Sequence, residues 1–243
     1  MNSIRKSAIT IGVLFIAAAV FSILGLVSYG PILNNPEYIT NGPTSENQIV
    51  LGAIFEMITA ITVAGTAIAF FPILRKHNET IALGYVGGRF LEAVLIIVGL
   101  VSLLTLLTLR QEFARGVTLD TSSLQAVDQL LRSTHAWAFI LGPNFMLGIN
   151  TLLYSSLLYR TKLVSRTVAS MGLVGAVSVF VAALLELFGV IDQVSAWGAV
   201  LSLPVAVYEM TLAVYLIAKG FRSTAFTSET ANLDTGELLA SPS

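Results

Sequence analysis

Five ionisable residues lie inside long apolar stretches of the sequence, where a charge is costly. They are Glu56, Arg89, Glu92, Glu186 and Glu209. A charged side chain at the middle of a bilayer costs about 2.5 to 3.5 kcal/mol on insertion scales, so each one needs a partner or a function. The helical rise per residue, counted from the ends of these stretches, places Glu92 and Glu209 near the midplane. Glu186 lies close to the end of its stretch, where its side chain is expected to reach the interface, so it carries less weight.

The four carboxylates outnumber the single guanidinium, and this excess is the main chemical clue in the sequence. Arg89 stays charged and can satisfy one or two carboxylates with its planar fork. At least two others must be protonated, wetted by a cavity or neutralised by a cation, because burial disfavours their charged form. One hypothesis is that Glu56 or Glu209 is a proton- or cation-binding carboxylate in an internal cavity. The alternative is that Arg89, Glu92 and Glu209 form a structural ion-pair network that holds helices in register.

Helical spacing groups further polar residues with these charges. Tyr85, Arg89 and Glu92 follow one another at four and three positions, which places them on one face of a helix. A neighbouring face carries Gly84 and Gly88, whose spacing permits close helix approach. Other polar residues expected to face the interior are Thr59, Thr62 and Thr66 near Glu56, and Tyr208 and Thr211 beside Glu209. The candidate binding residues are Glu56, Tyr85, Arg89, Glu92, Asn144, Asn150 and Glu209.

Composition indicates the kind of protein that must position these residues. Of 243 residues, 55% are hydrophobic and 11% are charged, against roughly 25% charged in a soluble domain. So few charges cannot cover a soluble globule of this length, which excludes a free cytosolic enzyme, a secreted disulfide scaffold and a disordered chain. The class of protein that remains is an integral membrane protein.

Six stretches are long enough for a helix to cross a bilayer core about 30 Å thick. The first resembles a signal peptide, but its apolar run of about 22 residues exceeds the 7 to 15 of such signals, so we expect it to be retained. The prediction is an all-α bundle of six transmembrane helices over 1–219 and a disordered cytoplasmic tail over 220–243. The stretches are about 8–30, 49–71, 82–109, 136–159, 167–190 and 198–218, with Pro143 and Pro204 expected to kink the fourth and sixth.

The positive charges predict an orientation. Nine of the 13 Lys and Arg residues lie on the side of the two termini and three on the other, while Arg89 is inside a stretch. The positive-inside rule then makes both termini cytoplasmic, in the plasma (inner) membrane of a bacterium. Between the third and fourth stretches, Ser122 and Gln125 fit a capping box that begins a short amphipathic surface helix, with Trp137 after it as an interfacial anchor.

The sequence contains no motif of a familiar class of enzyme. The chain has no cysteine, and its two histidines, His77 and His135, are expected on opposite sides of the membrane, so we predict no metal site. Gly-x-Ser-x-Gly, P-loop and Gly-x-Gly-x-x-Gly motifs are also missing from the sequence. We therefore name no catalytic residue and no cofactor. A net charge of −1 gives no basic field for nucleic acid.

Three segments of the first half carry a resemblance to a known family. They are Arg75-Lys76-His77-Asn78-Glu79, Ala82-Leu83-Gly84 and Gly88-Arg89-Phe90-Leu91-Glu92-Ala93-Val94, supported by Arg5-Lys6 and by Pro31-Ile-Leu-Asn-Asn-Pro36. Together they resemble the signature region of a bacterial membrane-protein family, the domain of unknown function DUF4386. The resemblance fades after about Leu109. It implies a multi-span bacterial membrane protein and supplies no activity.

Three classes of function are consistent with these patterns. The leading hypothesis is binding or translocation of a small solute, cationic or proton-coupled, which predicts a polar cavity reaching Glu92 or Glu209. The second is a membrane interaction, assembly or regulatory protein, which predicts an exposed small-residue groove near Gly84 and Gly88. An embedded lipid-modifying enzyme ranks third. The expected partners are the lipid bilayer, a small solute or proton, and a second copy of the chain in a homo-oligomer.

Overall fold

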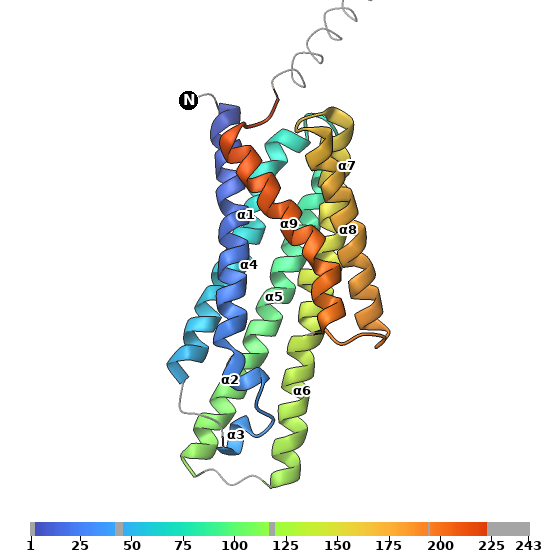
Figure 1. The fold of residues 1–243 in the computed structure, drawn as a ribbon. Coiled ribbons are helices and arrows are strands. Elements are labelled where there is room, and N and C mark those ends of the chain that lie inside the picture. Colours follow the sequence, from blue (N-terminus) through green and yellow to red (C-terminus); the bar gives the residue numbers. More distant parts are fainter. Residues whose placement is uncertain (1–2, 42–45, 117–119, 194, 223–243) are drawn as a thin grey trace, which may run out of the picture.

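The computed structural model describes residues 3–41, 46–116, 120–193 and 195–222, and within these ranges the chain is helical and has no strand (Figure 1). The helices are α1 (Ser3–Ser28), α2 (Gly30–Leu33), α3 (Tyr38–Asn41), α4 (Glu46–Leu74), α5 (Glu79–Ala114), α6 (Thr121–Phe139), the π-helix η1 (Ile140–Met146), α7 (Leu147–Thr161), α8 (Arg166–Leu187) and α9 (Ala196–Ala218).

Six helical segments are long and apolar enough to cross a membrane: α1, α4, α5, the continuous segment Ser122–Thr161, α8 and α9. The all-α bundle of six spanning helices is therefore confirmed, and the chain is a multi-pass membrane protein. The start of α1 and the end of α9 lie at the same end of the bundle (Figure 1), where Arg5 Nη1 donates to the Leu216 carbonyl at 3.1 Å. Residues 223–243 of the predicted tail lie outside the described residues.

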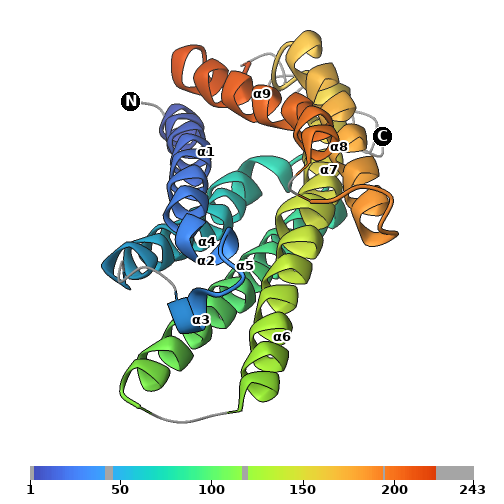
Figure 2. The same cartoon turned by 60° about the horizontal axis from the view of Figure 1, so that its bottom comes forward.

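The spanning helices form a closed ring. α1 packs on α4 and α9, α4 on α5, α5 on η1 and α7, α7 on α8, and α8 on α9. α1 and α9 lie close together at the end with the termini and diverge toward the opposite end (Figures 1 and 2). Because α5 and α9 are not neighbours in this ring, a contact between them has to cross its interior.

Basic residues gather at the end of the bundle that holds the termini. The start of α1, the α4–α5 turn, the α7–α8 connection and the end of α9 all lie there (Figure 1), and these segments carry the nine Lys and Arg residues counted above. We call this the basic end. The grouping is the one the sequence predicts, and the assignment of the basic end to the cytoplasm stays a prediction.

The fourth spanning helix differs from the prediction. α6 continues through η1 into α7, so residues expected to form a separate surface helix are instead the first part of a 40-residue spanning segment. The expected cap is also wrong, because Asp120 rather than Ser122 accepts from the Ser123 amide, at 2.7 Å. Hydrogen bonds from the Ser122 and Ser123 side chains and the Ser123 amide lower the pKa of Asp120 to about 2, which favours its charged form at the positive end of the helix dipole.

Two arginines join the segment that contains α2 and α3 to this long pair, α5 and α6. On α6, Arg132 Nη2 donates to the Asn35 carbonyl at 2.9 Å. On α5, the buried Arg110 donates to the Tyr38 carbonyl at 2.6 Å and lies over the Tyr38 ring. Two of the three basic residues predicted for the outer face therefore hold the connection between α1 and α4 in place.

A glycine permits a close backbone contact between α8 and α9. A Cβ built on Gly175 of α8 would lie 2.8 Å from Val205 Cα and 3.0 Å from Val205 N of α9. These are backbone atoms, so the helices themselves would have to separate. Gly87 on α5 is the opposite case, since a Cβ there meets nothing within 4 Å.

We expect Gly175→Ala to lower stability by about 1–3 kcal/mol, because the added methyl group overpacks the α8–α9 contact. Gly87→Ala is the control, and should be neutral or stabilising by about 0.5–1 kcal/mol because glycine weakens a helix interior. Thermal unfolding in detergent, followed by the loss of monodisperse protein, measures both. Equal unfolding temperatures for the two variants would contradict the close contact.

Candidate functional site

A buried ion-pair cluster joins α5 to α9 across the interior of the ring. Arg89 Nη1 donates to both carboxylate oxygens of Glu92, at 3.0 and 3.1 Å, and its Nη2 donates to Glu209 Oε1 at 3.2 Å. Arg89 is 2% exposed and Glu92 is 3% exposed. The three charges sum to −1 when all are ionised. The predicted face of α5 is thus confirmed, and its partner on the sixth helix is Glu209.

Asn150 of α7 completes the hydrogen bonds of Glu92. Its Nδ2 donates to Glu92 Oε2 at 2.8 Å, and the side chain is fully buried. Gly88 gives Asn150 room to approach α5, because a Cβ at Gly88 would overlap the Asn150 amide oxygen. The small-residue spacing of α5 therefore serves a contact inside the chain at Gly88.

Aromatic side chains surround the guanidinium and pack on its basic-end side. The Arg89 Cζ atom lies 5.6 Å from the ring centroids of both Phe15 and Tyr85, a cation–π arrangement that stabilises a buried cation. Tyr85 also donates to Thr66 Oγ1 at 3.3 Å. Tyr154 and Tyr208, both fully buried, extend this packing into the main hydrophobic core. The route from the cluster to the basic end is therefore filled with packed side chains.

A cavity of about 210 Å³ begins at the cluster and extends toward the opposite end. Arg89, Glu92 and Glu209 line it, together with residues that follow them away from the basic end on α1, α4, α5, η1, α8 and α9. Ala206 of α9 is exposed and Ser22 of α1 is partly exposed, so the cavity opens between these two diverging helices. Its polar lining residues are Ser22, Thr59, Thr66, Arg89, Glu92, Asn144, Ser202 and Glu209.

Glu209 is the member of the cluster that faces this cavity most openly. Its side chain is 16% exposed, against 3% for Arg89 and 4% for Glu92. It shares one hydrogen bond with Arg89, whereas Glu92 accepts from both Arg89 and Asn150. Of the three charged residues, Glu209 is therefore the most exposed and has the fewest hydrogen bonds from its neighbours.

Two predicted members lie apart from the cluster. Glu56 is only partly buried and accepts from the Tyr29 hydroxyl at 3.2 Å, and it does not line the cavity. Thr59, Thr62 and Thr66, on the same helix, are buried as predicted. The Thr211 hydroxyl donates a hydrogen bond to the Val207 carbonyl of its own helix, and Thr211 also lies outside the cavity. Of the two carboxylates named in the cation-binding hypothesis, Glu209 lines the cavity and Glu56 does not.

The sequence does not predict the role of Glu186. We expected its side chain at the interface, but it is 5% exposed and accepts from Asn144 Nδ2 at 2.7 Å. Its Oε1 has no hydrogen-bond partner within the described residues. Asn144 lies in η1 beside Pro143, and both line the cavity. Pro143 lacks the amide that an α-helical bond requires, and π-helices are frequent at functional sites.

The described residues contain few candidate metal ligands. His77 lies in the α4–α5 turn, and His135 is buried on α6 beside the Gly99 carbonyl, 3.3 Å from its Nδ1. In the ranges that the structure describes, no three His, Asp or Glu side chains lie close enough to hold a metal ion.

The sequence matches the domain of unknown function DUF4386 over residues 10–220. The chain belongs to this family. The match begins within α1, covers the other five spanning segments and continues far beyond Leu109, where the resemblance in the sequence fades. No curated protein and no solved structure matches the chain. The cluster, the cavity and the Glu186–Asn144 pair all lie within the DUF4386 region.

Arg89→Gln should destabilise this DUF4386 protein by about 3–5 kcal/mol, because it leaves two buried carboxylates without their counter-charge. The control is Arg115→Gln, which removes an exposed partner of Glu112 and should change stability by no more than about 0.5 kcal/mol. The measurement is the unfolding temperature of each variant in the same detergent. A second variant, Arg89→Gln combined with Glu92→Gln, should recover part of the loss; no recovery would contradict the ion pair.

Proposed function

We propose that this protein binds a small cationic or proton-coupled solute in the cavity beside Glu209 and moves it across the bacterial plasma membrane. The observation that carries the proposal is a cavity inside the ring that reaches a cluster with one more carboxylate than guanidinium. In a low-dielectric interior, that excess negative charge favours a proton or a small cation as its occupant.

The unequal environments of the two carboxylates support distinct roles. Glu92 is held by Arg89 and Asn150 and serves as the fixed counter-charge. Glu209 is held by Arg89 alone and lines the cavity. Protonation of Glu209 weakens its ion pair with Arg89, so α9 is the helix whose contacts respond to the occupant.

One cavity does not by itself provide a path across the membrane. Translocation requires that the solute reach the cavity from each side of the membrane in turn. We assign this packing, in which the aromatic residues beside Arg89 fill the basic end, to the state of the cycle that is closed at that end. In the orientation given by the positive-inside rule the basic end faces the cytoplasm, so this is the state closed toward the cytoplasm.

The second candidate is a purely structural network in a membrane interaction or assembly protein. The complete hydrogen bonding of Glu92 favours it, because a buried, fully paired carboxylate fixes helix register. It gives the cavity beside Glu209 no role. The small-residue groove expected of an interaction protein is partly filled, since Gly88 packs on Asn150 within the chain.

Cysteine accessibility tests translocation directly, because the chain has no cysteine of its own. We expect Ser202→Cys, in the cavity wall, to react with a membrane-impermeant thiol reagent from either side of the membrane, in right-side-out and inverted vesicles. Ser102→Cys is the control, since Ser102 is 4% exposed and lies outside the cavity, and it should not react. Reaction of Ser202→Cys from one side alone would contradict translocation, and no reaction would contradict the open cavity.

Carbodiimide labelling tests Glu209 as the protonated or cation-binding group. An apolar carbodiimide modifies a carboxylic acid, so labelling of Glu209 should decrease as pH rises and should decrease further with added sodium if a cation competes. Glu92 should react at least tenfold less because Arg89 and Asn150 hold its oxygens. Peptide mass spectrometry locates the adduct, and Glu209→Gln gives the background. Labelling of Glu92 in preference to Glu209 would overturn the assignment.

A further inference from the structure

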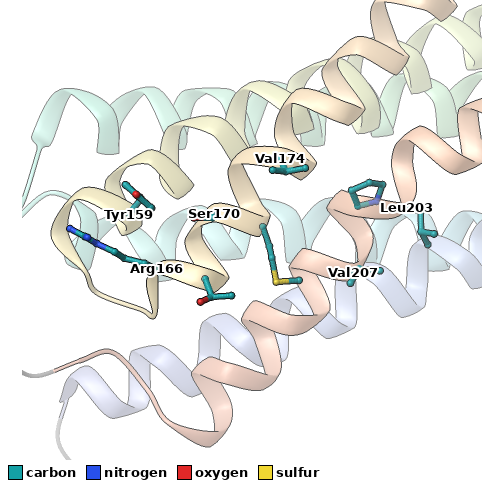
Figure 3. A pocket seen from close by; sticks show the side chains of 9 residues that line it. Tyr159, Arg166, Ser170, Val174, Leu203 and Val207 are labelled. Carbon is teal, nitrogen blue, oxygen red and sulfur yellow. The ribbon is translucent and has the colours of Figure 1, made fainter.

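A second hollow lies on the outer surface of the ring, between α8 and α9 (Figure 3). This groove has a volume of about 720 Å³, within the roughly 300–1,000 Å³ of sites that hold small ligands. Its walls are mainly apolar, and Tyr159 and Arg166 lie together at one end of it (Figure 3). Its labelled lining residues are Tyr159, Arg166, Ser170, Val174, Leu203 and Val207.

Helix packing explains why the groove is there. α8 and α9 meet closely where Gly175 packs on the Val205 backbone, and they separate toward the basic end (Figure 1). Val174 and Val207 flank this contact and face outward, at 65% and 47% exposed. The wedge between the helices is therefore left unfilled by the chain itself, at a depth where its surroundings are hydrocarbon.

Charge is confined to the basic end of the groove. Arg166 is the first residue of α8, and its guanidinium lies over the Tyr159 ring, with Cζ 5.6 Å from the centroid. Thr167 and Ser170 add two hydroxyls to the same part of the lining. Arg160 and Lys162, both exposed, lie in or next to the connection that leads into α8. An amphiphile with a negative head and an apolar tail matches this distribution.

We propose that the α8–α9 groove binds an anionic phospholipid of the surrounding bilayer, with its phosphate at Arg166 and an acyl chain between Val174 and Val207. The first turn of a spanning helix lies at the level of the headgroups, which places the guanidinium within reach of a lipid phosphate. Basic pockets between helices at the cytoplasmic surface are a known mode of anionic lipid binding. A polar solute would leave the apolar walls without contacts, so it fits the groove poorly.

This lipid site does not rest on the proposed function of the cavity. The two hollows use different faces of α9: Ser202, Val205, Ala206 and Glu209 line the cavity, whereas Leu203, Pro204 and Val207 line the groove. A substitution among the residues that line one hollow therefore leaves the lining of the other hollow unchanged.

Native mass spectrometry of the purified full chain, with phosphatidylglycerol or phosphatidylcholine added in detergent, tests the proposal. The wild type should retain about fivefold more phosphatidylglycerol than phosphatidylcholine, the preference expected of one interfacial arginine. Arg166→Gln should lose that preference. The matched control is Arg75→Gln, at the same end and also over an aromatic ring, that of Phe71, and it should keep the preference.

A second pair of variants tests the groove independently of charge. Val174→Trp fills the groove and should remove the bound lipid of either kind, whereas Val177→Trp, on the same helix at an exposed position outside the lining, should not. Both positions are exposed, so neither change disturbs the core. Unchanged lipid retention in Arg166→Gln or in Val174→Trp overturns the proposal. A polypeptide that co-purifies with the wild type and is lost with Val174→Trp also overturns it, because the groove would then belong to a protein partner.

Discussion

The burial of one guanidinium constrains more of this structure than any other feature. Arg89 cannot lose its charge, so every element near it has to supply a counter-charge, a hydrogen-bond acceptor or an aromatic face. Glu92 comes from the same helix, one turn away, and Glu209 comes from across the ring. Phe15 and Tyr85 cover the guanidinium with their rings. Side chains of α1, α5 and α9 thus meet around this single charge.

The same requirement keeps the interior from packing completely. α5 and α9 are not neighbours in the ring, and the ion pair between Arg89 and Glu209 spans the space that separates them. An apolar interior would close around small side chains, as it does where Gly175 meets Val205. Two carboxylates and a guanidinium do not pack in this way, because their positions are set by the polar atoms they bond to and not by the filling of space. The cavity beside Glu209 is the space left over.

Much of this arrangement could be predicted from the sequence, and the rest depends on contacts between distant segments. Apolar length predicts six spans, and helical spacing places Tyr85, Arg89 and Glu92 on one face, because both depend on local geometry alone. The partner of Glu186 could not be predicted in this way. Its burial depends on η1, where Pro143 interrupts the α-helical bonds and Asn144 meets the carboxylate. A count of residues from the end of α8 contains no information about that neighbouring helix.

The proposal of a binding site over a structural network rests on the count of charges and not on any motif. A network that served packing alone would be most stable when neutral, with one carboxylate for the guanidinium and both fully paired. Glu92 supplies one such charge and accepts from Asn150 as well, whereas Nη2 of Arg89 donates to Glu209. Glu209 adds a second negative charge, and it is the most exposed of the three cluster residues that line the cavity. A second carboxylate in this interior is stabilised by water in the cavity, by a proton or by a bound cation, and the proposed function assigns that place to a proton or a cation.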